Sequence, residues 1–156
     1  GNLLSTINSR CQSINFRRLK NSYLSEILTK NCIAGKEYLD CGLKQKELLA
    51  LSNGSPGAIL KNIDIWHEIP KNIWDKVKRI PNNSPIDALS SAKDITETLD
   101  TQQQIWLISW LQQYMWIKDK NLKALKILEK LKVHIKSFVN PRLAWEVALI
   151  QINDTN

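Results

Sequence analysis

One arginine stands out among the residues whose chemistry could serve a function. Arg10 lies between Ser9 and Cys11 in the run STINSRCQ, residues 5–12. Its guanidinium is always charged and presents a planar fork of N–H donors that matches phosphate oxygens. The chain begins with Gly1 rather than Met, so we expect this run to be either a leader without function or the cut end of a larger protein.

Other reactive side chains do not form a pattern that predicts an independent catalytic site. The sequence has no nucleophile–base set, no paired carboxylates, no HExxH and no GxxxxGK[ST]. Its three cysteines, Cys11, Cys32 and Cys41, fit neither a disulfide framework nor a CxxC metal pair. His67 and His134 lie far apart in the sequence. We therefore expect no enzyme activity, no cofactor and no metal.

The charge balance permits an acidic partner without requiring one. Lys and Arg number 22 against 15 Asp and Glu, a net charge of +7. A row of lysines could form a nucleic-acid face, or simply an ordinary solvated helix face. We favour the solvated face, because no exposed-looking aromatics alternate with these lysines to stack bases. The row comprises Lys118, Lys120, Lys123, Lys126, Lys130, Lys132 and Lys136.

The hydrophobic period is helical almost throughout and predicts an all-α fold. No apolar run approaches the roughly 20 residues that span a bilayer, so we expect no membrane contact. After a helix that begins near Ser22, residues 31–42 read as a loop. Further helices are predicted over residues 43–51, 71–80, 86–99, 101–118 and 122–139, with others beginning at Pro56 and Pro141.

Capping residues place the helix ends. Asn53-Gly54 ends one helix, and Ser55-Pro56 begins the next, with proline in the first turn, where its missing N–H costs nothing. Asn82-Asn83-Ser84-Pro85 forms the clearest linker and helix start. Residues 101–118 are apolar on more than one face, which indicates a helix surrounded by others. Each of the last two predicted helices has apolar residues along one of its own sides. These are Ala124, Leu128, Leu131, Ile135 and Phe138 in the first, and Leu143, Val147 and Ile150 in the second.

The tryptophans are either core or interface residues. There are six, and Trp106 and Trp110 stand one helical turn apart, so they share a face. For each one alone the core is the simpler interpretation. If the shared face is not filled within the bundle, it marks a partner interface, because tryptophan is common among interface hot spots.

Three ordered segments resemble the AAA+ clamp-loader subunits of bacterial DNA polymerase III. LLSTINSRCQ followed by INFRRL looks like their segment from sensor 1 to the SRC motif. ELLALSNGSPGAIL looks like the second signature, at the start of the last lid helix. FVNPRLAWEVALIQI is similar to the closing helix of the collar domain in the delta-prime type. Residues 61–137 match only in helical character.

Two departures favour the delta-prime type over the ATP-hydrolysing gamma/tau type. Gamma/tau relatives carry a sensor-2 arginine just after the Gly-Ser of the second signature, whereas Pro56 and Gly57 follow Gly54 and Ser55 here. The polar tail NDTN also replaces a long tau-type extension. The resemblance implies a subunit that catalyses no reaction itself and belongs to the DNA-directed DNA polymerase III holoenzyme in the cytoplasm.

The resemblance also implies domains, roles and partners. Residues 1–12 would be the remnant of an AAA+ domain, residues 13–62 a lid and residues 63–156 a collar bundle. Arg10 would act as an arginine finger in a neighbouring subunit's ATP site, with Ser9 and Cys11 positioning it. Candidate interface residues are Trp106, Trp110, Asn140, Pro141 and Arg142. The expected partners are gamma/tau and delta subunits through the collar, and the sliding clamp and primed DNA through the whole complex. The rivals are a gamma/tau fragment and a freestanding helical nucleic-acid-binding domain.

Overall fold

The computed structural model describes residues 17–31, 46–80, 84–137 and 140–155. Over these residues the regular structure is helical throughout, which confirms the predicted all-α class. None of the described helices is both long and apolar enough to cross a bilayer. The helices are α2 (Asn21–Asn31), α4 (Lys46–Ser52), α5 (Pro56–Glu68), α6 (Lys71–Val77), α7 (Pro85–Thr98), α8 (Thr101–Asp119), α9 (Leu122–Lys136) and α10 (Pro141–Asn153).

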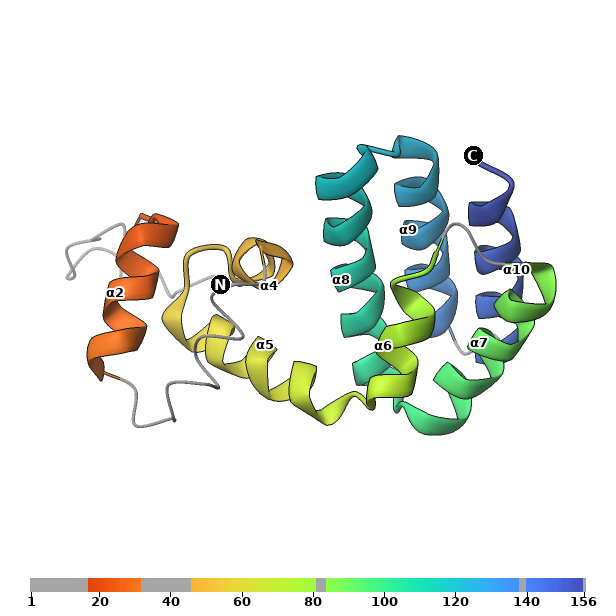
Figure 1. Cartoon of the computed structure of the whole chain (residues 1–156), viewed down its shortest axis with the longest axis horizontal. Coiled ribbons are helices and arrows are strands. Elements are labelled where there is room, and N and C mark those ends of the chain that lie inside the picture. Colours follow the sequence, from red (N-terminus) through yellow and green to blue (C-terminus); the bar gives the residue numbers. More distant parts are fainter. Residues whose placement is uncertain (1–16, 32–45, 81–83, 138–139, 156) are drawn as a thin grey trace, which may run out of the picture.

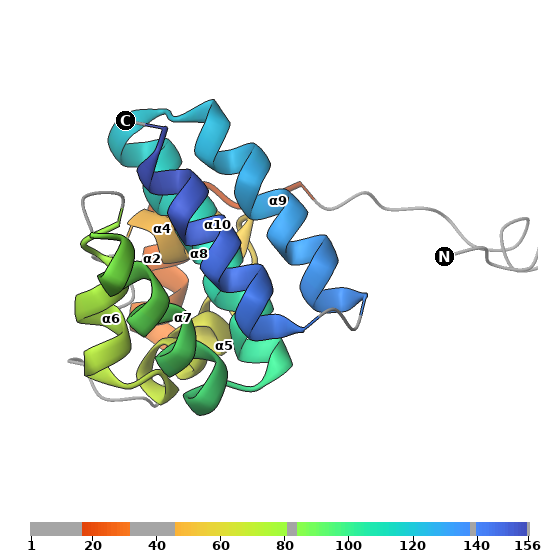
Figure 2. The same cartoon turned by 90° about the vertical axis from the view of Figure 1, so that its right-hand side faces the viewer.

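The helices gather at two ends of an elongated molecule (Figure 1). At one end lie α2, α4 and α5. At the other, α8, α9 and α10 stand side by side, with α6 and α7 packed around them. α4 packs against both α5 and α8, α7 packs against α10, and α9 contacts α8 and α10. Figure 2 shows α9 at the edge of this bundle, with much of its surface facing outward.

Side-chain caps place the helix starts where the sequence predicts them. Ser84 accepts a hydrogen bond from the backbone N–H of Asp87 through its hydroxyl, and the Asp87 carboxylate accepts one from the Ser84 backbone N–H. This reciprocal capping box satisfies donors that the first turn leaves without partners. α8 begins with a second such box, between Asp100 and Gln103.

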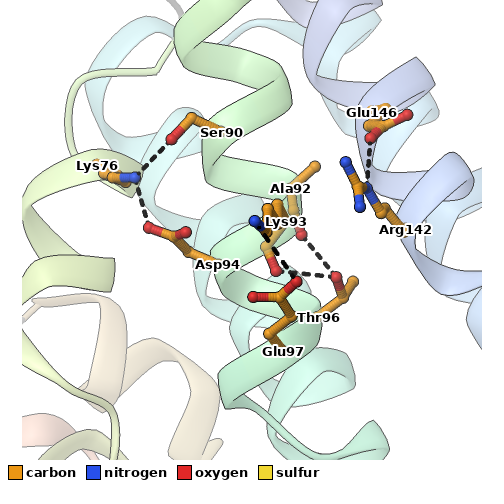
Figure 3. Close-up of polar contacts among 9 residues, drawn as sticks. All are labelled: Lys76, Ser90, Ala92, Lys93, Asp94, Thr96, Glu97, Arg142 and Glu146. Carbon is orange, nitrogen blue, oxygen red and sulfur yellow. Dashed lines mark hydrogen bonds and ion pairs between the residues drawn. The ribbon is translucent and has the colours of Figure 1, made fainter.

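Contacts between α6 and α7 fix these two short helices against each other. The Lys76 ammonium of α6 forms an ion pair with Asp94 and donates a hydrogen bond to the Ser90 hydroxyl, both in α7 (Figure 3). Because Lys76 and Asp94 are each about one-third exposed, the pair orients the helices more than it stabilises them.

Four aromatic rings fill the junction of α5, α6 and α8. Trp66 and Trp74 are stacked with centroids 3.7 Å apart, and Trp110 lies 5.5 and 4.8 Å from them. Tyr114 stacks on Trp110 at 5.0 Å. Offset and edge contacts of this kind add to the area that the rings bury. This tryptophan cluster (Trp66, Trp74, Trp110 and Tyr114) covers one face of α8, and contacts with α4 and α9 cover others, which explains why α8 needs apolar residues on several faces.

The buried core runs without a break from α2 to α10. Leu24 of α2, Leu48 of α4 and Ile152 of α10 belong to one cluster of buried residues. The boundary expected between residues 62 and 63 falls inside α5, which continues to Glu68. The division into lid and collar remains a prediction, and any such domains share both a helix and a core.

The expected stripe of α9 is buried at Ala124, Leu128, Leu131 and Ile135, while Phe138 lies outside the described residues. The last helix differs. Of the three residues predicted on one side, Leu143 and Val147 are exposed, whereas Ile150 is partly buried and packs against the core. α10 is apolar on more than one side, so the spacing of its apolar residues alone does not show which side is buried in the core. The side that faces the core carries Ala144, Trp145, Ala148, Leu149 and Ile152.

Candidate functional site

The first candidate group, Ser9, Arg10 and Cys11, lies outside the described residues. The arginine-finger role of Arg10 therefore remains a prediction from the resemblance. Within the described ranges, no three His, Cys, Asp or Glu side chains lie close enough to hold a metal ion.

The second candidate group forms a turn between two helices. Asn53 and Gly54 have φ angles of 48° and 76°, a region that glycine adopts without steric cost. A Cβ added to Gly54 would lie 2.6 Å from both the N and O atoms of Leu19. Ser55 then caps α5 by accepting from the Ala58 backbone N–H, and Pro56 occupies the first turn.

The glycine pair therefore differs in what the fold requires. Gly54 permits both the backbone turn and the close approach of the segment before α2. Gly57 has no atom within 4 Å of a Cβ built on it, so packing does not demand glycine there. Helix capping and backbone geometry account for the residues Gly54, Ser55 and Pro56 without a bound ligand.

The two candidate interface tryptophans occupy different environments. Trp110 is 1% exposed and lies in the tryptophan cluster, so its ring has no surface to offer a partner. Trp110 was a candidate interface residue for which the core was the simpler interpretation, and its burial places it in the core. Trp106 is half-buried, and its indole N–H donates to the Asn62 side-chain oxygen at 3.0 Å. Its interface role remains a prediction.

The third candidate group begins the last helix. The Asn140 side chain accepts from the backbone N–H groups of Arg142 and Leu143, and Pro141 takes the first helical position. The Arg142 guanidinium donates to the Glu146 carboxylate at 2.9 Å, one turn along α10 (Figure 3). All three residues are exposed. Their local contacts explain a helix start, and a further interface role for them is untested.

An apolar groove runs between α9 and α10. It has a volume of about 360 Å³. Its floor is formed by buried Leu131, Ala144 and Ala148, and Leu143 and Val147 stand along its α10 edge. Leu143 is 55% exposed and Val147 46% exposed. We call this surface the α9–α10 groove. It is lined by Ile127, Lys130, Leu131, His134, Leu143, Ala144, Val147, Ala148 and Gln151.

A second groove lies on the other side of α9. It has a volume of about 530 Å³ and is lined by residues of α8 and α9, including Trp116, Leu122 and Leu125. Trp116 and Leu122 are exposed. Glu129 accepts a hydrogen bond from the Gln112 side chain at 2.9 Å, which ties α9 to α8 along this side. We call this surface the α8–α9 groove.

The predicted lysine row divides between these surfaces. Lys132 donates to the Ser109 hydroxyl, and Lys118 lies over the Tyr114 ring. Lys126 lines the α8–α9 groove and Lys130 the α9–α10 groove, while Lys123 is exposed and lines neither. Lys126 and Lys130 also share a hollow on the outer side of α9, so part of the row forms one face while Lys118 and Lys132 are held elsewhere. The exposed Trp116 lines the same groove as Lys126, an aromatic that the sequence analysis did not place near the lysines.

Both grooves were missed by reasoning from sequence. Leu143 and Val147 were recognised as sharing a side, but nothing in the periodicity indicates that the side is uncovered. Trp116 gave no separate signal among six tryptophans. Aliphatic and aromatic side chains exposed along a groove can bind another polypeptide by excluding water from apolar surface.

The architecture defines a class first: an all-α helical bundle with a closed aromatic core and uncovered grooves along one outer helix. The family follows from comparison with known proteins. Residues 22–152 match the family described as "Cyanobacterial DNA polymerase III delta prime, C-terminal domain". The match covers well over half of the chain, which therefore belongs to this family. No curated protein and no solved structure matched the chain.

Proposed function

We propose that this chain is part of a subunit of the bacterial clamp loader and that its work is to bind sister subunits rather than to catalyse a reaction. The family match supports the delta-prime assignment. In the intact assembly, which acts in the cytoplasm, the subunit would help to load the sliding clamp onto primed DNA. The gamma/tau and delta subunits are the proposed partners.

The observation that carries the proposal is the pair of grooves on opposite sides of α9. A subunit within a ring or arc has a neighbour on each side, so it needs two different binding surfaces. The floor of the α9–α10 groove belongs to the buried core, whereas Leu143 and Val147 along its edge do not. The exposed side chains along the grooves therefore remain available to partners.

Arg10 has a separate role in this proposal. In the full-length protein its guanidinium would reach the ATP bound by a neighbour and stabilise charge that develops on the γ-phosphate. Arg10→Ala in the full-length protein should leave assembly intact and slow ATP-driven clamp loading. Clamp-loading rates that do not change would remove this role while leaving the assembly role untouched.

Co-elution tests the assembly role. This chain is mixed with the C-terminal collar region of the gamma/tau subunit from the same organism, and the mixture is separated by size-exclusion chromatography. We expect a joint peak that neither component gives alone. A binding free energy of about 8 kcal/mol corresponds to a dissociation constant of about 1 μM. Separate elution at concentrations well above this value contradicts the proposal.

A further inference from the structure

The α9–α10 groove has a one-sided charge. Its lining includes Lys130 and His134 but no Asp or Glu. Neither Lys126 nor Lys130 forms an ion pair within the described part of the chain. Glu129 lines a neighbouring hollow on α9 with Lys130 and His134 but accepts a hydrogen bond from Gln112 on the α8 side, and Glu146 is paired with Arg142. The α9 edge of this groove is therefore basic.

The shape of the groove suits a helix. Ala144 and Ala148 are one turn apart and form a low floor, while Leu143 and Val147, also one turn apart, form a ridge beside it. Small residues between larger ones let the side chains of a packed helix enter the groove. An apolar stripe spaced at i, i+3/i+4 and i+7 fits a surface that repeats once per helical turn.

From this shape and charge we infer that the α9–α10 groove binds an amphipathic helix of a sister subunit whose apolar stripe is flanked by carboxylates along its α9-facing edge. The inference rests on the proposed function and deepens it by assigning one groove its partner chemistry. The apolar stripe would cover Leu143 and Val147, and a carboxylate would pair with Lys130. Carboxylates placed against this edge would also speed encounter and fix the register of the helix.

A second copy of this chain is a poor occupant. Among the described helices, the most acidic one with exposed apolar residues is α7, where Ile86 and Leu89 face outward. The three α7 carboxylates are already engaged: Asp87 in the capping box, Asp94 with Lys76 and Glu97 with Lys93. The net charge of +7 also opposes the approach of two copies.

The experiment measures binding of the full-length protein to the gamma/tau and delta subunits of the same organism by titration. Lys130→Glu should weaken binding to one of them by about tenfold or more, because it replaces an attraction by a repulsion. Lys136→Glu is the matched control, since it makes the same charge change on α9 outside both grooves and about 120° around the helix from Lys130, and it should alter the affinity by less than about threefold. Leu143→Ala combined with Val147→Ala should weaken the same interaction by about tenfold or more.

Each contrary outcome has a distinct meaning. If the native protein binds its sister subunits and the Lys130 and Leu143/Val147 variants bind equally well, the groove inference is overturned and the proposed function stands. If the native protein binds no sister subunit, both fail. A dimer in sedimentation that Lys130→Glu abolishes would assign the groove to a second copy. Binding of a fluorescent single-stranded oligonucleotide that Lys130→Glu abolishes would assign it to nucleic acid. Either result overturns the inference.

Discussion

The tryptophan cluster and the α9–α10 groove use large apolar residues in opposite ways. In the cluster, rings from α5, α6 and α8 cover one another, and Trp110 is almost fully buried. Along the groove, Leu143 and Val147 remain about half exposed, although the core beside them is complete. The first region stabilises the chain by itself, whereas the second gains most of its burial only when another chain covers it.

The difference shows that apolar character alone does not reveal what a residue does in this fold. α10 carries both uses on one helix: Trp145 and Leu149 face the core, while Leu143 and Val147 face outward. Replacing the same residue type at a buried and at an exposed position therefore separates effects on the free energy of unfolding from effects on binding.

The largest effect is expected where a buried tryptophan is removed. Trp145 is fully buried, and its indole N–H donates to the Gln104 side-chain oxygen at 3.0 Å. Trp145→Ala should lower the free energy of unfolding by about 3–5 kcal/mol, because it leaves a large cavity. Urea unfolding followed by circular dichroism at 222 nm measures this. The control, Trp116→Ala at an exposed position, should cost about 1 kcal/mol or less; equal losses would remove the distinction between covered and uncovered tryptophans.

A leucine pair on α10 sharpens the comparison within one helix. Leu149 is 1% exposed, whereas Leu143 lies on the uncovered side. Leu149→Ala should cost about 2–5 kcal/mol of unfolding free energy, and Leu143→Ala should change it by about 0.5 kcal/mol or less. Thermal and urea unfolding of the isolated chain supply both values. A large loss for Leu143→Ala would mean that the groove edge serves stability rather than binding.

The α4–α5 turn offers a glycine pair. Gly54→Ala should destabilise the chain by about 2 kcal/mol or more, since it forces a Cβ into a positive-φ position and against the backbone of Leu19, 2.6 Å away. Gly57→Ala should be neutral or stabilising by up to about 1 kcal/mol, because alanine favours the helix and the Cβ meets no atom. The melting temperature of Gly54→Ala should fall below the native value, and that of Gly57→Ala should equal or exceed it. A Gly54→Ala variant with the native melting temperature would contradict the described turn.

The smallest effect is a difference between two buried indoles. The Trp110 N–H has no hydrogen-bond acceptor within the described residues, whereas the Trp145 N–H bonds to Gln104. Trp145→Phe leaves the buried Gln104 oxygen without that donor, while Trp110→Phe removes a donor that had no acceptor. We expect Trp145→Phe to cost about 1–2 kcal/mol more than Trp110→Phe. Equal unfolding free energies would indicate that the Gln104 bond contributes nothing.

Much of the fold follows from local signals in the sequence. Ser55-Pro56, Ser84-Pro85 and Asn140-Pro141 predicted helix starts, and the structure confirms each as a cap followed by proline in the first turn. These signals depend only on neighbouring residues and on backbone geometry. The order and type of the described helices are therefore readable without an alignment.

The candidate site was less predictable because it depends on tertiary packing. The contacts of Asn62 with Trp106 and of Gln104 with Trp145 join residues more than 40 positions apart. Such contacts decide which of two apolar sides is covered, and no helical period encodes them. The sequence suggested a partner interface on a tryptophan face, but it did not show that aliphatic residues of α10 are the ones left exposed.

Hydrogen–deuterium exchange of the full-length protein, alone and in complex with its sister clamp-loader subunits, tests the central claim most directly. If partners cover the grooves beside α9, backbone amides of α9 and α10 should exchange more slowly in the complex, while α5 and α6 around the tryptophan cluster should change little. Unchanged exchange in α9 and α10 within a complex that demonstrably forms would contradict the claim.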